Sequence, residues 1–316
     1  TISDKVSCGV AISVPVDLAS SSKTMGTSKN KIYMYKFLRS LRKKILVKTQ
    51  KHPDYLDLFI AMTGRTPNTG VYLEENRKPV CEIQVTLPLN FDDAIWPMIG
   101  WLAGHKSPNG IPVLNGLENI SINNDALKAL CAAFGTTSAA PMLHIKGHTP
   151  EGKLSTIEDA KSKIIMPSDL YDLWQNFNTG SNKIDLVAIG SPHASTTECM
   201  QFLELLIHKN EKVIVPTILT VGRETLSKLK DQGYLSQFSK LSVQVVPDIC
   251  WCSITEPIFP SKTEALITNS GKYAHYGKGL TGRNVRFGSL EACVNASING
   301  CVDNEIPKWL MPYSAL

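Results

Sequence analysis

The segment Leu266–Val302, LITNSGKYAHYGKGLTGRNVRFGSLEACVNASINGCV, contains the pattern that decides the fold. An apolar run ends in a turn that is rich in polar side chains, namely Ser270, Lys272, Tyr273, His275 and Tyr276. A second short apolar run and a helix of small residues follow. Open α/β folds place ligands where polar groups meet at the end of a buried strand. Taken alone, the segment predicts either a ligand site or a solvated loop.

Strand-like and helix-like segments alternate through most of the chain. Strands are expected at 81–87, 111–114, 142–146, 184–189, 212–215, 241–246 and 265–268. Helices are expected at 54–63, 91–103, 124–134, 169–177, 196–208, 223–232 and 290–298. This alternation predicts an α/β fold of parallel-sheet layers with helices on both faces, arranged in two lobes.

Shifts in composition suggest where the parts begin and end. We expect a basic N-terminal segment (1–52), a first α/β lobe (53–153), a polar connector with a helix (154–183), a second α/β lobe (184–305) and a C-terminal tail (306–316). The second lobe holds most of the polar strand ends described below.

The charge of the chain is concentrated near its N-terminus. The 316 residues carry a net charge of +5, but residues 1–60 alone carry +7 and the remainder carries −2. A nearly neutral body argues against a nucleic-acid surface. No apolar run reaches the 18 residues of a membrane-spanning helix, so we expect no transmembrane segment.

A basic amphipathic helix is expected at 31–48, within the acid-free stretch 23–51. Its apolar residues recur every three or four positions, with lysines and arginines largely off that stripe. Such a helix either packs as a surface helix or serves as a membrane-binding or organelle-targeting segment. The sequence leaves both readings open.

The chain has eight cysteines, at positions 8, 81, 131, 199, 250, 252, 293 and 301. They form no CxxC pair, and a chain of this length needs no disulfides to build a core. We therefore expect buried thiols in a reducing compartment, with one or two as metal ligands. The first 20 residues lack the pattern of a secretory signal, so the predicted location is cytoplasmic.

A second polar strand end is Val187–Ser195, VAIGSPHAS. A helix begins after Ser195, and Glu198 lies at the spacing of a capping box. A helix N-terminus beside His193 can bind an anion. Alternatively, His193 forms a hydrogen bond only within its own turn.

Two further strand ends carry groups that could act in chemistry. In Val245–Cys252, VVPDICWC, the thiol of Cys250 follows a strand and is either an iron ligand or an inert buried cysteine. In His144–Glu151, HIKGHTPE, both His148 and Glu151 are able to transfer protons.

Together these segments resemble the large-subunit catalytic region of the aconitase X family. The resemblance runs from about residue 54 to 302, with order and spacing kept. The matching residues are Gly64–Pro67, Gly70, Arg77, Trp96–Gly100, Ile111–Leu114, Asp125–Leu130, His144–Glu151, Gly190–Ser195, Arg223, Asp248–Cys250 and Asn269–Tyr276.

The resemblance implies an aconitase-like fold and an iron–sulfur hydro-lyase of small hydroxy acids, either cis-3-hydroxyproline or phosphomevalonate. It also implies a small swivelling subunit as partner. Cys250 takes the position of a cluster ligand. The catalytic residues implied are His193, Ser270 and Lys272, and the substrate-binding residues are Arg77, His148, Arg223 and Ser195.

The chain departs from the family pattern at three points. Ser191 stands where the family has a cysteine ligand, and a hydroxyl is a poor substitute for a thiolate on iron. The family's upstream region, which holds a further cluster cysteine, has no counterpart in residues 1–50. The swivelling domain, which supplies a serine, is also not matched. The alternative hypothesis is therefore a non-catalytic relative that binds a small acid or a protein.

Overall fold

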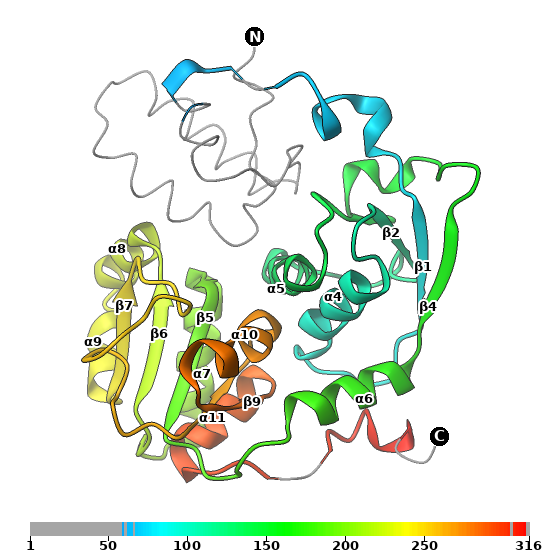
Figure 1. The fold of residues 1–316 in the computed structure, drawn as a ribbon. Helices are drawn as coiled ribbons and strands as arrows, with labels where there is room; N and C mark the ends of the chain where they lie inside the picture. Colours follow the sequence, from blue (N-terminus) through cyan, green and yellow to red (C-terminus); the bar gives the residue numbers. More distant parts are fainter. Residues whose placement is uncertain (1–58, 60–61, 66, 304–305, 314–316) are drawn as a thin grey trace.

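Two parallel β-sheets organise the protein. The computed structural model describes residues 59, 62–65, 67–303 and 306–313. The first sheet has the order β3-β2-β1-β4, and the second has the order β7-β6-β5-β8-β9 (Figure 1). All strands in both sheets pair in parallel. The predicted α/β fold class is confirmed.

Some predictions fall where the structure gives no description. The basic segment 1–52, with its helix at 31–48, lies outside the described residues, and the helix expected at 54–63 lies mostly outside them. Within the described residues, no helix combines the length and apolarity that crossing a membrane requires.

The first sheet packs on three helices. Its strands are β1 (Cys81–Val85), β2 (Pro112–Asn115), β3 (His144–Ile145) and β4 (Lys161–Ile165), and its helices are α4 (Ile95–Lys106), α5 (Asn124–Thr137) and α6 (Pro167–Phe177). Four 3₁₀ helices accompany it: η3 (Gly70–Tyr72), η4 (Glu74–Arg77), η5 (Pro150–Lys153) and η6 (Met311–Tyr313). In β1, Cys81, Ile83 and Val85 are buried while Gln84 is exposed, as the two-residue period of a strand requires. The buried side chains join the core formed with the three helices.

The segment 154–183 belongs largely to this first sheet. The sequence suggests a polar connector there, but residues 161–165 form β4, which pairs with β1 so that Ile83 lies opposite Lys163. Three of the five β4 side chains are exposed, and β4 lies at one edge of the sheet. An exposed edge strand lacks the apolar run by which a buried strand is recognised in a sequence.

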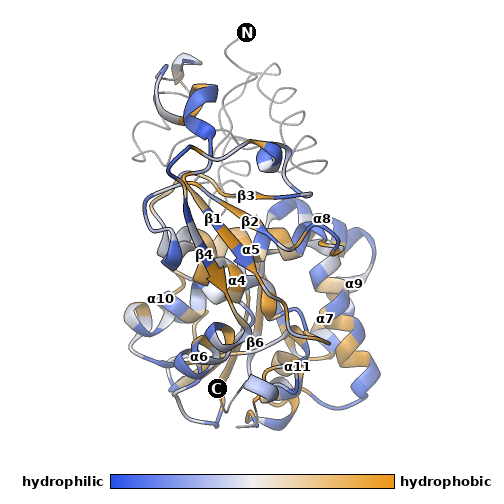
Figure 2. Ribbon diagram, turned by 90° about the vertical axis from the view of Figure 1, so that its right-hand side faces the viewer, coloured by the Kyte–Doolittle hydropathy of each residue, from blue (hydrophilic) through white to orange (hydrophobic). Residues whose placement is uncertain are grey.

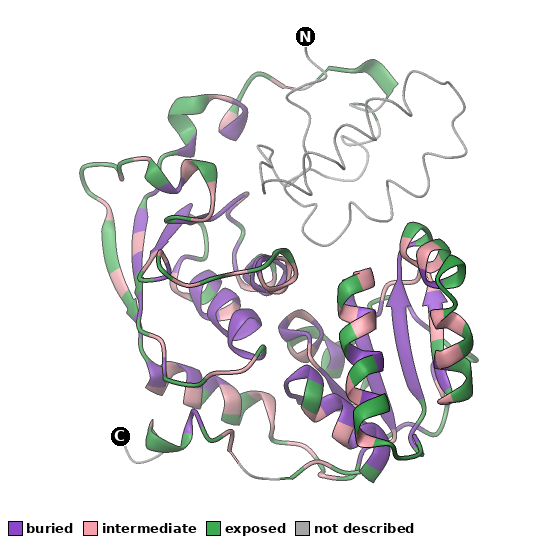
Figure 3. Cartoon of the chain, turned by 180° about the vertical axis from the view of Figure 1, so that it is seen from behind, coloured by how far each residue is buried: buried purple, intermediate pink, exposed green. Residues whose placement is uncertain are grey.

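The second sheet has helices on one face and a helix with a loop on the other. Its strands are β5 (Leu186–Ala194), β6 (Thr217–Val221), β7 (Val243–Pro247), β8 (Ala265–Thr268) and β9 (Asn284–Phe287). Its helices are α7 (Thr196–Lys209), α8 (Arg223–Asp231), α9 (Tyr234–Lys240), α10 (Gly271–Thr281) and α11 (Leu290–Asn299). One core lies under α7, α8, α9 and α11, and the other lies under α10 and the loop that holds Trp251, Ile254 and Phe259. Apolar residues are concentrated along the strands (Figure 2), which are also largely buried (Figure 3).

Two sequence-based expectations for this half were wrong. The strand expected at 212–215 begins later, at Thr217. Val213 and Val215 are buried, but the amides of Ile214 and Val215 donate to the Ser297 carbonyl of α11 instead of to a strand. The polar turn expected after Thr268 is instead helix α10, because the Ser270 side chain accepts a hydrogen bond from the Tyr273 amide at 3.1 Å and caps the helix.

The two sheets are joined through α10 and through the C-terminal residues. A Cβ atom added to Gly271 would lie 2.9 Å from Pro97 Cβ, so the first turn of α10 touches α4 closely. Phe287 of β9 lies in the core of the first sheet, with its ring centroid 5.4 Å from that of Phe177. Trp309 and Leu310, in the segment expected to be a tail, are buried in the same core.

Candidate functional site

The carboxyl ends of the parallel strands of the second sheet lie at one edge of that sheet. Along the chain, β5, β6 and β7 are added in one direction, and the chain then returns to place β8 on the other side of β5. The strand order therefore reverses between β5 and β8. Ligands of open α/β sheets bind at such a switch point, beyond the carboxyl ends of the strands.

A small cavity lies at this switch point. Its lining comes from the end of β5, the start of α7, the β8–α10 turn, α4 and α5, and consists of Pro97, Lys128, Ala129, Ile189, Gly190, Ser191, Pro192, Ala194, Glu198, Asn269, Ser270 and Gly271. The cavity encloses about 20 Å³, room for about one water-sized group. Helices of the first sheet thus close a site that is built on the second sheet.

The last residues of β5, where its pairing with β6 shifts register, bring the Ser191 hydroxyl to this cavity. Ser191 is buried, and its Oγ atom has no hydrogen-bond partner among the described residues. The Ser191 carbonyl accepts a short hydrogen bond from Ser270 Oγ, which ties the β5 turn to the start of α10. Two of the sequence-predicted positions, Ser191 and Ser270, therefore meet at one point.

His193 and Ser195 continue the same turn. His193 Nε2 lies 2.9 Å from the Ile249 carbonyl oxygen, and because a carbonyl only accepts, Nε2 carries the ring hydrogen. Ser195 Oγ accepts from the Glu198 amide at 3.1 Å, and the Ser195 amide donates to Glu198 Oε2 at 2.7 Å. The predicted capping box of α7 is confirmed. Ser195 Oγ also donates to Asp125 Oδ2 at 2.8 Å.

Lys128 of α5 is a cavity residue that the sequence analysis missed. Its ammonium group forms a short ion pair with Glu198 Oε2, and it lies 3.2 Å both from Asp125 Oδ1 and from the His193 carbonyl oxygen. Burial lowers the pKa of Lys128, but the charges of Glu198 and Asp125 outweigh it, so that pKa lies above its ordinary value. Asp125 lies three residues before Lys128, so the sequence could suggest an ion pair between them. Glu198 lies 70 residues away, and no sequence pattern indicates that it pairs with Lys128.

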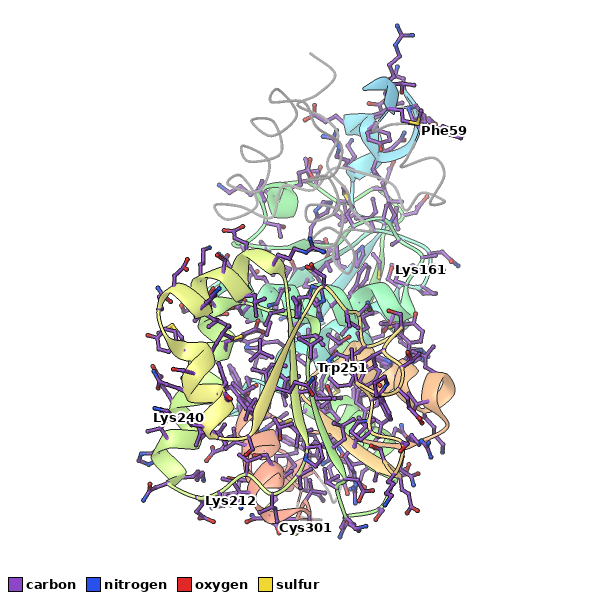
Figure 4. The ribbon with its side chains drawn as sticks, turned by 90° about the vertical axis from the view of Figure 1, so that its left-hand side faces the viewer. Phe59, Lys161, Lys212, Lys240, Trp251 and Cys301 are labelled. Atoms are coloured by element: carbon purple, nitrogen blue, oxygen red, sulfur yellow. The ribbon has the colours of Figure 1, made fainter. Side chains whose placement is uncertain are left out.

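The turn after β7 holds two thiols beside α10. The Cys252 amide lies 3.4 Å from Cys250 Sγ. Between them, Trp251 is buried beside the strands of the second sheet (Figure 4), with its indole N–H donating to the Ile189 carbonyl at 2.9 Å. The Trp251 ring lies 5.4 Å from that of Tyr273 in α10, and burial raises the pKa of the Tyr273 hydroxyl. Lys272 is close enough for its charge to act on the Cys252 thiol.

Arg223 lies at the same edge of the sheet but near its surface. It begins α8, and its guanidinium forms a short ion pair with Asp248, which follows β7. The Arg223 amide also donates to Asp248 Oδ1 at 3.2 Å. This pair holds the β6 and β7 ends together outside the cavity.

Arg77 and His148 are not brought to the cavity. Arg77 Nε donates to the Val71 carbonyl at 2.7 Å, Nη2 donates to the Tyr72 carbonyl at 2.9 Å, and Nη1 lies 3.2 Å from Glu151 Oε1. His148 Nε2 lies 2.8 Å from the Leu117 carbonyl oxygen. These contacts organise loops of the first sheet, so substrate binding by Arg77 and His148 stays a prediction.

The described residues do not provide the donors that an iron–sulfur cluster needs. Such clusters are held by several thiolates. The strand ends supply the thiols of Cys250 and Cys252 and the hydroxyl of Ser191, and no group of three or more histidine, cysteine, aspartate or glutamate side chains among the described residues could hold a metal ion. The donors of the described residues therefore do not fit an iron–sulfur cluster.

Fold and site define a class of protein, an open parallel α/β protein with a polar site at the switch point of its sheet. Comparison with known families identifies the particular family. The model of the second aconitase X domain matches residues 78–175, and that of the third matches residues 184–299. The chain belongs to the aconitase X family, as the sequence resemblance predicts.

Curated relatives and a solved structure agree with this assignment. The chain is 36% identical over 274 residues to a cis-3-hydroxy-L-proline dehydratase of Hypocrea jecorina and 36% identical over 269 residues to one of Pseudomonas aeruginosa; each match covers 83% of this chain and 46% of the relative. It is 29% identical over 235 residues to a phosphomevalonate dehydratase large subunit of Thermococcus kodakarensis, covering 74% of this chain and 59% of the relative. A crystal structure of Thermococcus kodakaraensis aconitase X in its holo-form superposes with a TM-score of 0.71 at 27% identity, over 79% of this chain and 63% of that one. The chain spans about half the length of the curated relatives it matches.

Proposed function

We propose that this chain forms the substrate-binding half of a hydro-lyase that removes water from a small hydroxy acid. The observation that carries the proposal is the cavity at the β5–β8 switch point, where Ser191 and Ser270 meet. The relatives named above, which are dehydratases, support the reaction class.

Among hydroxy acids, we propose a cyclic amino acid of the cis-3-hydroxyproline type. The two relatives with that name are 36% identical to the chain, whereas those named for phosphomevalonate are between 23% and 31% identical. The charge of the cavity agrees with this choice. Lys128 is already paired with Glu198 and Asp125, so the lining has little positive charge left for a phosphate.

In this proposal His193 and Lys272 handle protons. Elimination of water requires a base at one carbon and a proton for the departing hydroxyl at the next. His193 is held in one tautomer by the Ile249 carbonyl, and Lys272 brings a positive charge to the same sheet edge. The Cys250 position implies iron in the family, but since the described donors do not fit a cluster, each of these steps is assigned to a protein group.

The proposed partner is a small subunit or domain that completes the site. One family of relatives is named as a large subunit, and the matched relatives are about twice as long as the aligned part of this chain. The residues that the cavity lacks for a complete elimination site would come from that partner.

The proposal is tested by supplying the chain with cis-3-hydroxy-L-proline or with phosphomevalonate. The assay is run anaerobically with iron and sulfide present, both alone and with a separately expressed small subunit of the aconitase X type. We expect loss of one water molecule from hydroxyproline, seen by mass spectrometry. We also expect His193→Ala and Lys272→Met to slow the reaction by roughly 100-fold or more.

His208→Ala is the matched control, because His208 is exposed on α7, and it should leave the rate unchanged. Absence of water loss under all these conditions would contradict the proposed function and favour a non-catalytic chain that binds a small acid.

A further inference from the structure

The cavity holds a buried hydroxyl that the fold itself does not use. Ser191 is 6% exposed, and its Oγ atom has no hydrogen-bond partner among the described residues. Leaving a buried hydroxyl unpaired destabilises a protein, and such groups call for an explanation in terms of water, an ion or a ligand. The Ser191 carbonyl, by contrast, accepts a short hydrogen bond from Ser270 Oγ. The hydroxyl is therefore free to donate to something inside the cavity.

The N-terminus of α10 faces the same cavity. Ser270 Oγ accepts from the Tyr273 amide at 3.1 Å, and the Ser270 carbonyl accepts from the Ala274 amide at 2.8 Å. The amides of Gly271 and Lys272 have no acceptor among the described residues. Gly271 also lines the cavity without a side chain that would cover its amide. A helix N-terminus with unused N–H groups carries partial positive charge and attracts anions.

We propose that Ser191 Oγ and the first amides of α10 form a subsite for the carboxylate of the substrate. One carboxylate oxygen accepts from the Ser191 hydroxyl, and the other accepts from the α10 amides. This inference rests on the proposed function, because it assigns the acid group of that substrate. It also gives Ser191 a role as a hydrogen-bond donor in place of the metal-ligand position that the family resemblance implies.

The charges around the cavity favour a carboxylate over a phosphate. Glu198 lines the cavity and Asp125 lies behind it, and both share the single ammonium group of Lys128. Two carboxylates against one cation oppose a phosphate dianion more strongly than a singly charged carboxylate. A singly charged carboxylate is therefore the more favourable anion at this cavity.

The test measures binding and does not need turnover. The whole chain is titrated calorimetrically with L-proline, with pyrrolidine, which lacks the carboxylate, and with inorganic phosphate. We expect L-proline to bind, and pyrrolidine and phosphate to bind much more weakly or not at all. Ser191→Ala should weaken L-proline binding on the order of 10- to 100-fold, the usual loss for a hydrogen bond to a charged group.

Ser297→Ala is the matched control. Ser297 is also a buried serine, but it lies in α11 away from the cavity and donates to the Val294 carbonyl at 2.6 Å. It should leave L-proline affinity unchanged. Ser191→Ala should not lower the unfolding temperature of the ligand-free chain, because it removes an unpaired group, and this outcome separates lost binding from misfolding.

Three results would overturn the inference. These are no L-proline binding by the unaltered chain, equal affinity of Ser191→Ala, or tighter binding of phosphate than of L-proline. The proposed function fails separately: a chain that binds L-proline through Ser191 but never eliminates water keeps this subsite and loses the dehydratase assignment.

Discussion

Gly190 permits the register shift in β5 that places Ser191 at the cavity. Its φ angle is +102°, and a Cβ atom added there would lie 2.2 Å from the Thr220 carbonyl oxygen. A side chain at this position would meet both an unfavourable backbone angle and a backbone atom of β6. The glycine is therefore needed by the shape of the site and not by helix or strand preference.

We expect Gly190→Ala to lower the free energy of unfolding by about 3–5 kcal/mol, from backbone strain together with the clash. Gly233→Ala is the control, because Gly233 also has a positive φ, of +77°, but nothing lies within 4 Å of its added Cβ. It should cost only about 1 kcal/mol. Urea unfolding measures the change in the free energy of unfolding for each of the two variants. Equal losses of unfolding free energy in the two variants would show that the clash with the Thr220 carbonyl does not contribute.

His144 gives the chain a pH dependence of known sign. Burial lowers the pKa of His144, and its Nε2 donates to the Arg77 carbonyl at 2.8 Å. The unfolded state therefore binds a proton at His144 more readily than the folded state does. The contribution of neutral His144 to the free energy of unfolding is complete above the unfolded pKa of about 6.5, and it is lost as the pH falls through the lower pKa of His144 in the folded state. We expect His144→Gln, which keeps a donor, to flatten the unfolding free energy over this range. His208→Gln, at an exposed position, should leave the slope as it is.

At the level of elements, α10 connects the two sheets through its first turn. A Cβ at Gly271 would lie 2.9 Å from Pro97 Cβ and 3.4 Å from Ala133 Cβ, so α4 and α5 both press against this end of the helix. Gly279, later in the same helix, has no such neighbour, because nothing lies within 4 Å of a Cβ atom added there. One helix thus offers a packed glycine and an open one.

We expect Gly271→Ala to destabilise the protein by roughly 1–3 kcal/mol through overpacking. Gly279→Ala should stabilise it by about 0.5–1 kcal/mol, because alanine is favoured over glycine within a helix. Opposite shifts in the urea midpoint would support close contact between α10 and the first sheet. A gain of stability in both variants would contradict it.

Sequence patterns predicted buried elements better than exposed or glycine-containing ones. The strand Ala265–Thr268 has the predicted bounds, because four consecutive apolar or β-branched residues signal a buried strand. Helix α10 was missed because its glycines hide the helical period, and β4 was missed because it is largely exposed. The site was predictable as a set of strand ends, since parallel strands bring these to one edge. Lys128 was not, because its partner Glu198, at the start of α7, comes close to it only in the folded chain.

On the scale of the whole molecule, the cavity exists only while the two sheets stay together. Lys128 of the first lobe is held by Glu198 at the start of α7 and by the His193 carbonyl in the second lobe. Ser195 Oγ adds a bond to Asp125 across the same boundary. A polar network of this kind aligns two surfaces in one register, because each group loses its partner if they slide.

The last prediction concerns this network. Lys128→Met leaves Glu198 half-buried with its counter-charge removed, which should lower the free energy of unfolding by roughly 2–3 kcal/mol. This is below the loss of a fully buried pair, because 24% of the Lys128 side chain and 19% of the Glu198 side chain are exposed. Lys228→Met is the control, since Lys228 pairs with Glu224 at 2.7 Å on the surface of α8 and should lose about 0.5 kcal/mol or less. Adding Glu198→Gln to Lys128→Met should recover part of the loss, because it removes the unpaired charge. If the double variant is no more stable than the single one, charge pairing between the lobes does not hold the cavity closed.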